Sequence, residues 1–374
     1  MSEDKAGKAN SMRDSANRVK LAVFAANGKG GAFTHHPDRF NGDWDAQVRL
    51  AKSAEEIGFE GFVSASRWKP FGGDGHYSGD LMETFTWAAA IAASTDRISV
   101  MSTVHMTIIH PVIAAKMATT VDLVSKGRFG MNLVCGWYPA EMAMFDEDVK
   151  PHEDRYALAD EWVEIFDRLF AGESFDYSGD YYKLRGALNQ PRPVQHRPFF
   201  MNAGGSPRGS EFAAKNADVA FIIAQSPDPQ KMKGQVDQYR SLARERFGKE
   251  IQIGLSTYVV QRDTREEAEA YVQKYVVEQG DDAAVAEFIE ANVANSKTMP
   301  DGAIRQMSFA IKAGYGGFPL VGTAAEIADT IELLSQAGVD TLLLTWLDYE
   351  GGLQAFGRDI VPLLEEKGLR VPLS

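Results

Sequence analysis

The sequence predicts an α/β protein that folds as a single (β/α)8 TIM barrel with insertions at its C-terminal face. Two observations predict this fold. Short apolar runs typical of buried parallel strands alternate with segments of helical periodicity along the whole chain. The turn after the first run, at 27–33, lacks the Gly-x-Gly-x-x-Gly pattern that the competing fold, a doubly wound dinucleotide-binding sheet, would carry there.

Eight strands are expected, each from a short run rich in apolar residues. In the fourth, Gly127 and Gly136 bracket Met131–Val134, a run that is apolar except for the amide of Asn132. A buried amide without a partner costs about 1–3 kcal/mol, so Asn132 must either satisfy neighbouring backbone or face a ligand. The expected strands are 19–25, 59–64, 98–105, 131–134, 199–203, 217–224, 251–261 and 341–347.

Helices are expected between these strands, where apolar residues recur every three to four positions. Val48, Ala51 and Ala54 illustrate this spacing in the first helix, and Pro111 opens the third at a position where its missing N–H does no harm. The expected helices are 45–57, 81–94, 111–125, 153–170, 229–247, 264–278, 323–337 and 353–366.

The domain organisation is expected to be simple. Residues 1–18 are polar and rich in small residues, which predicts a flexible leader before a single barrel domain over 19–374. Three stretches are longer than the alternation requires, and those that follow strands are expected at the C-terminal face. They are a loop at 138–152, a segment with a hairpin at 172–197, and a segment at 280–320 that shows no clear strand and is expected near the barrel mouth.

Composition excludes several classes of function. The chain has 374 residues, with 39 Lys and Arg against 52 Asp and Glu, so its formal charge is −13. This charge argues against nucleic acid or an anionic membrane as a partner. The single cysteine, Cys135, excludes an internal disulfide framework. There is no apolar run of the roughly 20 residues that a membrane span requires, and the start lacks a secretory signal, so we expect a cytoplasmic protein.

Polar residues at the expected strand ends are the candidates for chemistry, because barrel enzymes build their sites there. Together they would line one rim of the barrel. They are Thr103, Asn132, Glu141, Ser206 and the pair Arg67 and Trp68.

An anion site is also indicated. Ser206 and Pro207 have the pattern of an N-cap followed by proline at the first helical position, and two glycines precede them. Such a helix N-terminus favours a phosphate, although an ordinary capped helix has the same pattern. Arg155 and Tyr156, early in the helix after the fourth strand, could add a charge and a hydroxyl.

The sequence does not indicate a metal site. His105 and His110 are five residues apart, and the strand ends otherwise carry Thr, Asn and Gly. Cys135 has no adjacent histidine and lies in an apolar strand, so packing is its expected role. The aromatic residues near strand ends could be core, but a flat ring system at a barrel mouth would need such walls. Phe71, Trp137 and Trp346 are the candidates for the substrate pocket.

Several segments carry a family pattern in order along nearly the whole chain. They are Phe71–Gly73, Glu83–Thr86, Ala115–Asp122, Gly127–Gly130, Asn132–Trp137, Arg155–Tyr156, Ala203–Ser206, Leu320–Thr323, Phe356–Gly357 and Pro362–Leu363. With them the chain resembles the bacterial luciferase-like superfamily of flavin-dependent monooxygenases. Within it, the chain is most similar to pyrimidine monooxygenases and next to dimethyl sulfone monooxygenases.

The resemblance implies a barrel that binds reduced FMN, supplied by a separate NAD(P)H-dependent flavin reductase. Thr103 and Asn132 match the polar pair that positions oxygen beside the flavin. The residues matching cofactor contacts are Asn132, Glu141, Arg155, Tyr156 and Ser206, with Arg67 and Trp68 matching less closely. We also expect a homo-oligomer, a dimer or a tetramer.

The implied function is that of a two-component monooxygenase dependent on FMNH2 and O2. It would act through a flavin peroxide on a small amide-like heterocycle, such as a pyrimidine, or on an organosulfur compound. Two alternatives stay open: a deazaflavin-dependent dehydrogenase of the same superfamily and a non-catalytic flavin-binding protein. Substrate identity is open, because Cys135 replaces the threonine of the pyrimidine relatives and the serine of the sulfone relatives. Arg208 without a nearby histidine disfavours a simple sulfonate.

Overall fold

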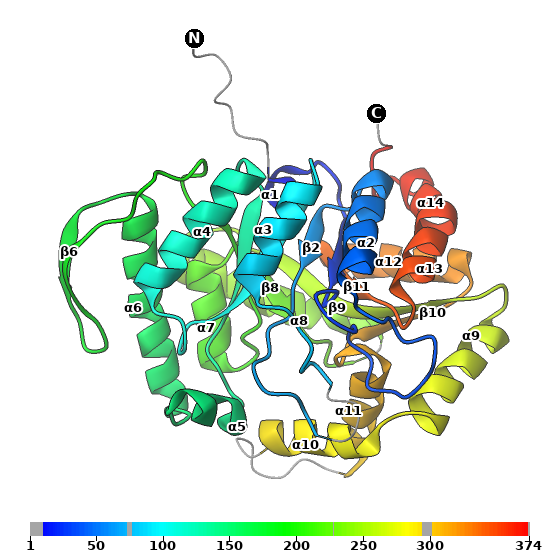
Figure 1. The fold of residues 1–374 in the computed structure, drawn as a ribbon. Helices are drawn as coiled ribbons and strands as arrows, with labels where there is room; N and C mark the ends of the chain where they lie inside the picture. Colours follow the sequence, from blue (N-terminus) through cyan, green and yellow to red (C-terminus); the bar gives the residue numbers. More distant parts are fainter. Residues whose placement is uncertain (1–9, 73–76, 227, 294–300, 373–374) are drawn as a thin grey trace.

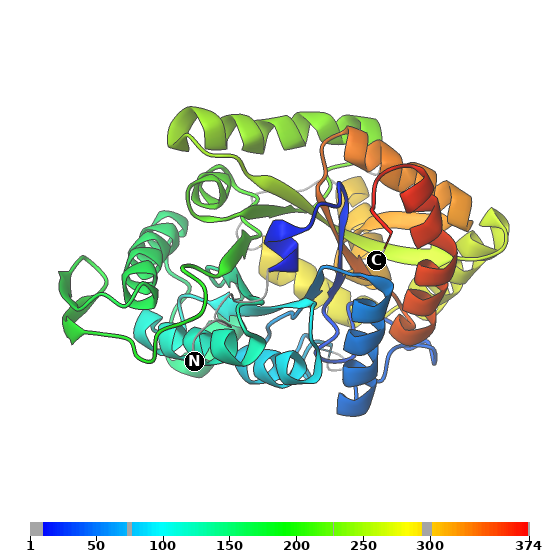
Figure 2. The ribbon, with the colours of Figure 1, turned by 90° about the horizontal axis from the view of Figure 1, so that it is seen from above.

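The computed structural model describes residues 10–72, 77–226, 228–293 and 301–372. Eight parallel strands close into a barrel in the order β1-β2-β3-β4-β7-β8-β9-β11, with β11 pairing back onto β1, which confirms the predicted (β/α)8 fold (Figures 1 and 2). The strands are β1 Lys20–Phe24, β2 Gly61–Val63, β3 Ser99–His105, β4 Phe129–Val134, β7 Phe199–Asn202, β8 Val219–Ile222, β9 Gln252–Gln261 and β11 Thr341–Thr345.

Helices surround the barrel, and their bounds follow the predicted ones closely. Most start at a side-chain cap: Asp43 accepts a hydrogen bond from Ala46 N ahead of α2, and Thr323 forms a capping box ahead of α12. The surrounding helices are α2 Trp44–Ile57, α3 Thr84–Ser94, α4 Pro111–Ser125, α6 His152–Phe170, α7 Pro207–Asn216, α8 Pro229–Phe247, α9 Arg265–Val272, α12 Ala324–Gln336, α13 Tyr349–Ala355 and α14 Val361–Glu366.

Two of the surrounding helices differ in kind from the prediction. The helix expected over 264–278 changes to a π-helix at Gln273–Glu278, and a second π-helix, Phe356–Ile360, joins α13 to α14. The hairpin expected in 172–197 is present as β5 Phe175–Ser178 and β6 Lys183–Ala187, which projects from the side of the barrel (Figure 1).

Side-chain alternation along the strands separates an inner core from an outer core. On β3, Val100 and Val104 pack in the outer core with the helices, whereas Met101 packs inside the barrel. On β4, Met131 and Leu133 are likewise in the outer core. The side chains on the opposite face of each strand, those of residues 103 and 132, therefore point into the barrel.

The leader prediction is wrong for residues 10–18. Ser11–Asp14 form α1, and the buried Met12 joins the inner core of the barrel. Asn10 donates to Phe129 O at 3.2 Å, and Lys20 Nζ donates to Met12 O at 2.7 Å. This helix closes the N-terminal end of the barrel, at the top of Figure 1. Residues 1–9 lie outside the described part of the chain.

Two of the insertions contain elements that were not predicted: the expected loop at 138–152, and the segment at 280–320 in which no clear strand was expected. Part of 138–152 forms α5 Pro139–Met142 and a 3-10 helix at Ala143–Phe145. In the segment 280–320, the structure has α10 Asp282–Val293, α11 Asp301–Gly314 and a ninth strand, β10 Phe318–Gly322, paired with the end of β9. The strand was missed because Pro319 interrupts its short apolar run and Gly316 and Gly317 directly precede it.

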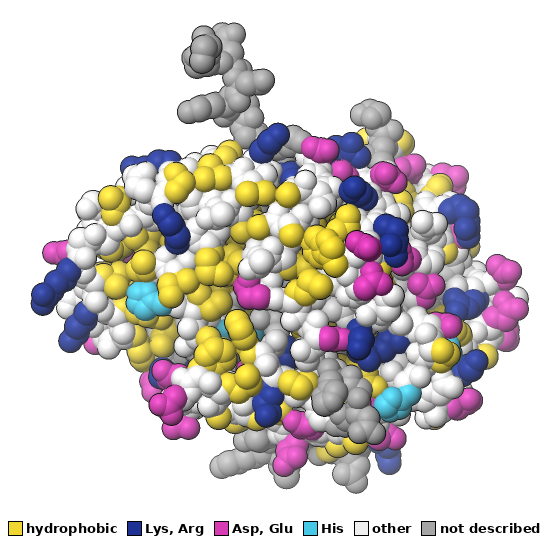
Figure 3. Space-filling view, viewed as in Figure 1, with side chains coloured by type: hydrophobic (Ala, Val, Ile, Leu, Met, Phe, Trp, Pro, Cys, Tyr) yellow, Lys and Arg dark blue, Asp and Glu magenta, His cyan; other side chains and the backbone are white. Residues whose placement is uncertain are grey.

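These added helices mark the barrel's C-terminal face. In Figure 1, α5, α10 and α11 lie below the strands, at the end opposite to α1. The polar candidates at strand ends therefore meet a roof made of α10 and α11. The surface of the barrel flank is different: apolar side chains gather over α3 and α4 in Figure 3, where Ile113 is 55% exposed.

Candidate functional site

The polar pair predicted on the third and fourth strands is formed. Thr103 and Asn132 are register partners across β3 and β4, and both side chains are nearly fully buried. Asn132 Nδ2 donates to Thr103 Oγ1 at 3.1 Å, and Thr103 Oγ1 donates to Ser64 O at 2.6 Å. Because Ser64 O can only accept, the threonine proton is committed to it and the amide must present its nitrogen to Thr103. Both parts of the pair are thereby oriented.

This orientation leaves one polar atom without a partner. Within the described residues, Asn132 Oδ1 is buried and accepts no hydrogen bond. An unmet buried acceptor is costly, which marks it as a ligand contact or a water site. It lies on the inward face of β4 near its C-terminal end, where barrel enzymes hold their ligands. The pair therefore offers an acceptor to a ligand N–H or O–H group.

The anion site predicted at Ser206 has the geometry of a capped helix. Ser206 Oγ accepts from Gly209 N at 3.0 Å at the start of α7, and His152 Nε2 lies 2.9 Å from the same oxygen. A side chain at Gly204 would come within 2.7 Å of the Gly209 backbone, so the strand-to-helix turn requires glycine there. His152 was not predicted, because as an isolated loop histidine it carries no motif.

Arg155 and Tyr156 of α6 lie beside this helix end. Tyr156 OH is only 2.5 Å from the position that a Cβ on Gly209 would occupy, which places the phenol at the first turn of α7. Burial raises the pKa of Tyr156 to about 12, so it stays a protonated donor. Arg155 Nη1 donates to Gly136 O at 2.6 Å, and among the described residues its buried Nε has no partner. Tyr156 is therefore at the start of α7, whereas the contact of Arg155 is with the backbone that follows β4, and their role at a phosphate stays a prediction.

Glu141 does not stand open as a cofactor contact. It is fully buried on α5, where Arg67 Nη1 donates to it at 2.9 Å and the backbone N–H of Trp68 at 2.6 Å. Arg67 is therefore a structural partner of Glu141, and the indole of Trp68 is 38% exposed. This ion pair joins the loop after β2 to α5, and a cofactor contact by Glu141, Arg67 or Trp68 stays a prediction.

His105 completes this buried cluster. Its Nε2 lies 3.5 Å from Glu141 Oε2, and its Nδ1 lies 3.3 Å from Ser66 Oγ. Burial lowers the pKa of His105 to about 4, although Glu141 opposes the shift. His105 is therefore neutral at pH 7. The sequence suggested this histidine only as a poor metal ligand; its position at the end of β3 was the signal for a place near the site.

The predicted pocket aromatics separate into two groups. Phe71 and Trp137 lie together, with ring centroids 6.2 Å apart, and both pack on Phe288 of α10. The Arg67 guanidinium lies 5.1 Å from the Phe71 ring centroid and 5.0 Å from that of Trp137. These rings form a wall beneath α10 at the barrel mouth.

Trp346 is elsewhere. It packs between Phe59 and Phe356 in the outer core, against the helices rather than the barrel mouth. The expectation of Trp346 in the substrate pocket is therefore withdrawn. The expectation failed because the side chain of residue 346 points outward, like those of Leu342 and Leu344 on β11. The sequence does not reveal the direction of a side chain that follows the end of a strand.

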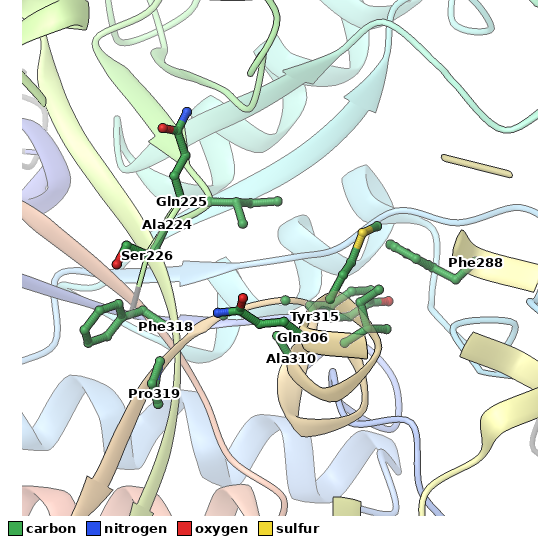
Figure 4. Close-up of a pocket in the computed structure, with 14 residues that line it drawn as sticks. Ala224, Gln225, Ser226, Phe288, Gln306, Ala310, Tyr315, Phe318 and Pro319 are labelled. Atoms are coloured by element: carbon green, nitrogen blue, oxygen red, sulfur yellow. The ribbon is translucent and has the colours of Figure 1, made fainter. Parts of the chain in front are cut away.

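A pocket of about 460 Å³ opens beside the end of β8 (Figure 4). It lies between the residues that follow β8 and those of α11, with Phe288 of α10 at its far side in the figure. None of its described lining residues was predicted, because α11 and β10 were not recognised. Elsewhere in the described chain, no group of three or more His, Cys, Asp or Glu side chains could hold a metal ion. Among the described helices, none has the length and apolar character needed to cross a membrane.

The fold and the polar residues at its strand ends define a class: (β/α)8 barrel proteins whose candidate site lies at the C-terminal face. Comparison with known proteins narrows it. The pattern of the luciferase-like monooxygenase family matches residues 19–341. The chain belongs to this family, which makes it a flavin-dependent oxidoreductase and confirms the resemblance drawn from its motifs.

Individual relatives agree over nearly the full length. An FMNH2-dependent dimethylsulfone monooxygenase of Pseudomonas putida is 29% identical over 93% of this chain and 96% of its own. The pyrimidine monooxygenase RutA of Klebsiella pneumoniae (strain 342) is 30% identical over 95% and 99%. The crystal structure of DmoA from Hyphomicrobium sulfonivorans has the same fold, with a TM-score of 0.82 at 22% identity over 96% of this chain and 90% of that chain.

Proposed function

We propose that the protein is a two-component monooxygenase that takes reduced FMN from a separate NAD(P)H-dependent flavin reductase and uses O2. We propose further that it acts on a small amide-like or organosulfur compound. The observation that carries the proposal is the oriented pair Thr103–Asn132, with a buried acceptor that no described residue satisfies. Two relatives support the proposal by their names: an FMNH2-dependent dimethylsulfone monooxygenase and a pyrimidine monooxygenase.

The residues present fit FMN. Arg155, Tyr156 and Ser206 would hold the phosphate, since a protonated phenol, a helix cap and a guanidinium with an unsatisfied Nε are suited to a dianion. Asn132 Oδ1 would accept from an N–H of the reduced ring. When bound, the reduced flavin supplies the electrons that activate O2.

The protein residues orient the reactants and exclude water. Asn132 is held by Thr103, which is itself held by Ser64 O, so the amide is fixed before any ligand arrives. Because the Thr103 proton is committed to Ser64 O, Thr103 acts by orienting Asn132 rather than by donating to oxygen. The Phe71–Trp137 wall and α10 cover the mouth and limit access of bulk water.

One experiment separates this proposal from its rivals. The protein, reduced FMN and a generic reductase are placed in an oxygen electrode with sulfone and pyrimidine substrates. The proposal requires substrate-dependent oxygen uptake matched by product. A deazaflavin-dependent dehydrogenase would instead transfer hydride without oxygen, and a non-catalytic flavin protein would bind flavin without any substrate-dependent oxygen uptake. Either result would contradict the proposal.

We also propose a homo-oligomer working in the cytoplasm. The exposed apolar side chains of α4, with Ile113 at 55% and Val124 at 41% exposure, support self-association. Sedimentation equilibrium measures the assembly directly. A monomer at micromolar concentration would contradict this part of the proposal.

A further inference from the structure

The pocket beside β8 belongs to the inner face of the barrel. Val219 and Phe221 form an inward row of β8 in the inner core, and Ile223, which lines the pocket, is the first residue after that strand. Strands lie about 4.8 Å apart and only β7 separates β8 from β4, so this row lies roughly 10 Å from that of Asn132. The pocket and the polar pair therefore open into the same barrel mouth.

The pocket's apolar surface has no cover within the described chain. Ile223 is 60% exposed, which is unusual for an isoleucine inside a concavity. Met307 and Ala310 of α11 face the same space, with Phe288 beyond them (Figure 4). Apolar groups that remain open in a concave site gain stability when an apolar ligand covers them.

The lining also decides the charge of a ligand. Among the described lining residues none is Asp, Glu, Lys, Arg or His, and the polar groups are those of Gln225, Ser226, Gln306 and Tyr315. Burial raises the pKa of Tyr315, which keeps that phenol neutral. In Figure 4 the amide of Gln306 points toward Ser226 and Phe318. An ion would lose its hydration here without gaining an opposite charge, whereas a neutral molecule loses much less.

The volume of the pocket indicates the size of the ligand that would fill it. About 460 Å³ lies within the range of sites that hold drug-sized ligands. A free pyrimidine or dimethyl sulfone would leave most of this space to water, and its apolar walls would stay uncovered.

We infer that the substrate is an uncharged organic molecule whose extended apolar part fills the pocket between β8 and α11, while its reacting end lies toward the barrel mouth that the pocket shares with Thr103–Asn132. The inference rests on the proposed function and specifies its substrate class. Each methylene group of the substrate that is buried in the pocket should lower the dissociation constant about fourfold, because its transfer from water to apolar surroundings is favourable.

Isothermal titration with three probes tests this inference about the substrate. The affinity of each probe for the protein is measured in the absence and in the presence of reduced flavin. Dibutyl sulfone is large and neutral, dimethyl sulfone is small and neutral, and 1-octanesulfonate is large and anionic. We expect dibutyl sulfone to bind at least tenfold more tightly than either of the others. Equal affinities, tighter binding of the anion, or no measurable binding of dibutyl sulfone would overturn the inference.

Two variants locate the binding. Ala310→Trp on α11 and Ile223→Trp on the facing wall should each weaken dibutyl sulfone binding at least tenfold. Ala286→Trp, an exposed position of α10 outside the pocket, is the matched control and should bind like the parent. Melting temperatures identify a variant that fails to fold. If one pocket variant fails to fold, the affinity of the other shows whether the ligand binds in the pocket. Unchanged affinity in a folded pocket variant would place the ligand elsewhere.

The two levels of proposal fail separately. If reduced FMN does not bind, or no substrate gives substrate-dependent oxygen uptake matched by product, the proposed monooxygenase function fails. If reduced FMN binds and oxygen is consumed with dimethyl sulfone or a pyrimidine, but dibutyl sulfone gains no affinity, only the inference about the substrate fails.

Discussion

The candidate chemistry depends on the direction of a few single atoms. Asn132 could have turned either end of its amide into the barrel, and the chain of contacts through Thr103 to Ser64 O selects the oxygen. A similar contact fixes Arg155, whose Nη1 bonds Gly136 O and leaves Nε free among the described atoms. The fold thus leaves Asn132 Oδ1 and Arg155 Nε without a partner among the described residues.

The polar pair should matter more for turnover than for binding. Asn132→Ala and Thr103→Val should lower product formation about 10²–10³-fold, the typical loss when one preorganised polar contact is removed from an active site. Affinity for reduced FMN should fall much less, since the phosphate contacts remain. Product formed per reduced flavin consumed, measured with the melting temperature, checks this. If both variants melt normally and couple as well as the parent, the positioning role is wrong.

The phosphate contact should show the opposite pattern. Arg155→Ala should weaken reduced FMN binding about ten- to hundredfold, because a charge-assisted hydrogen bond is worth about 1.5–3 kcal/mol. Anaerobic fluorescence titration measures the dissociation constant. Arg192→Ala, which removes an exposed arginine that contacts Ala171 at the end of α6 opposite to Arg155, is the control. An unchanged constant in Arg155→Ala would remove this residue from the cofactor site.

At the scale of elements, short segments between strands and helices assemble the barrel mouth. α5 brings Glu141 to the loop that follows β2, and α10 places Phe288 on the wall of Phe71 and Trp137. Glu287 of α10 also bonds Tyr138 OH at 2.5 Å, which ties the roof to the chain that follows β4. Segments that the sequence marked only as insertions therefore shape the site.

The Glu141 ion pair should be a large contributor to stability. Glu141→Gln leaves Arg67 buried without an anionic partner, and breaking such a pair typically costs about 3–5 kcal/mol of unfolding free energy. Denaturant unfolding monitored by tryptophan fluorescence measures the loss. Glu147→Gln, which breaks an exposed pair with Lys150, should change stability by less than about 0.5 kcal/mol. Equal effects of the two changes would argue against this account.

At the scale of the whole molecule, the closed barrel imposes burial on groups at its ends. α1 closes the N-terminal end with Met12, and His105 is enclosed at the C-terminal end with Glu141, Arg67 and Ser66. Burial at the first end stabilises the protein through apolar contact. Burial of His105 makes stability depend on pH.

His105 should destabilise the protein as the pH falls. Folding lowers its pKa from 6.5 to about 4, so the unfolded chain binds the extra proton first. Stability is therefore complete above pH 6.5 and decreases by about 3 kcal/mol between pH 7 and pH 4. In His105→Gln this share of the pH dependence should vanish, whereas the exposed His196→Gln should keep it. Denaturant unfolding curves at several pH values measure the free energy of unfolding of each protein. If this free energy depends on pH in the same way in the parent and in His105→Gln, the account of His105 is wrong.

The sequence alone determined the barrel, most helix bounds, the family and the inward pair. Strand and helix periodicities are local, and the side-chain alternation of Thr103 and Asn132 follows from the period of two once β3 and β4 are recognised. Tertiary structure decided what distant residues do to one another. It committed Glu141 to Arg67, turned Trp346 outward, and set α11 beside β8 to form the pocket. Contacts between residues far apart in the chain depend on the packing of whole elements, and no local pattern encodes those contacts.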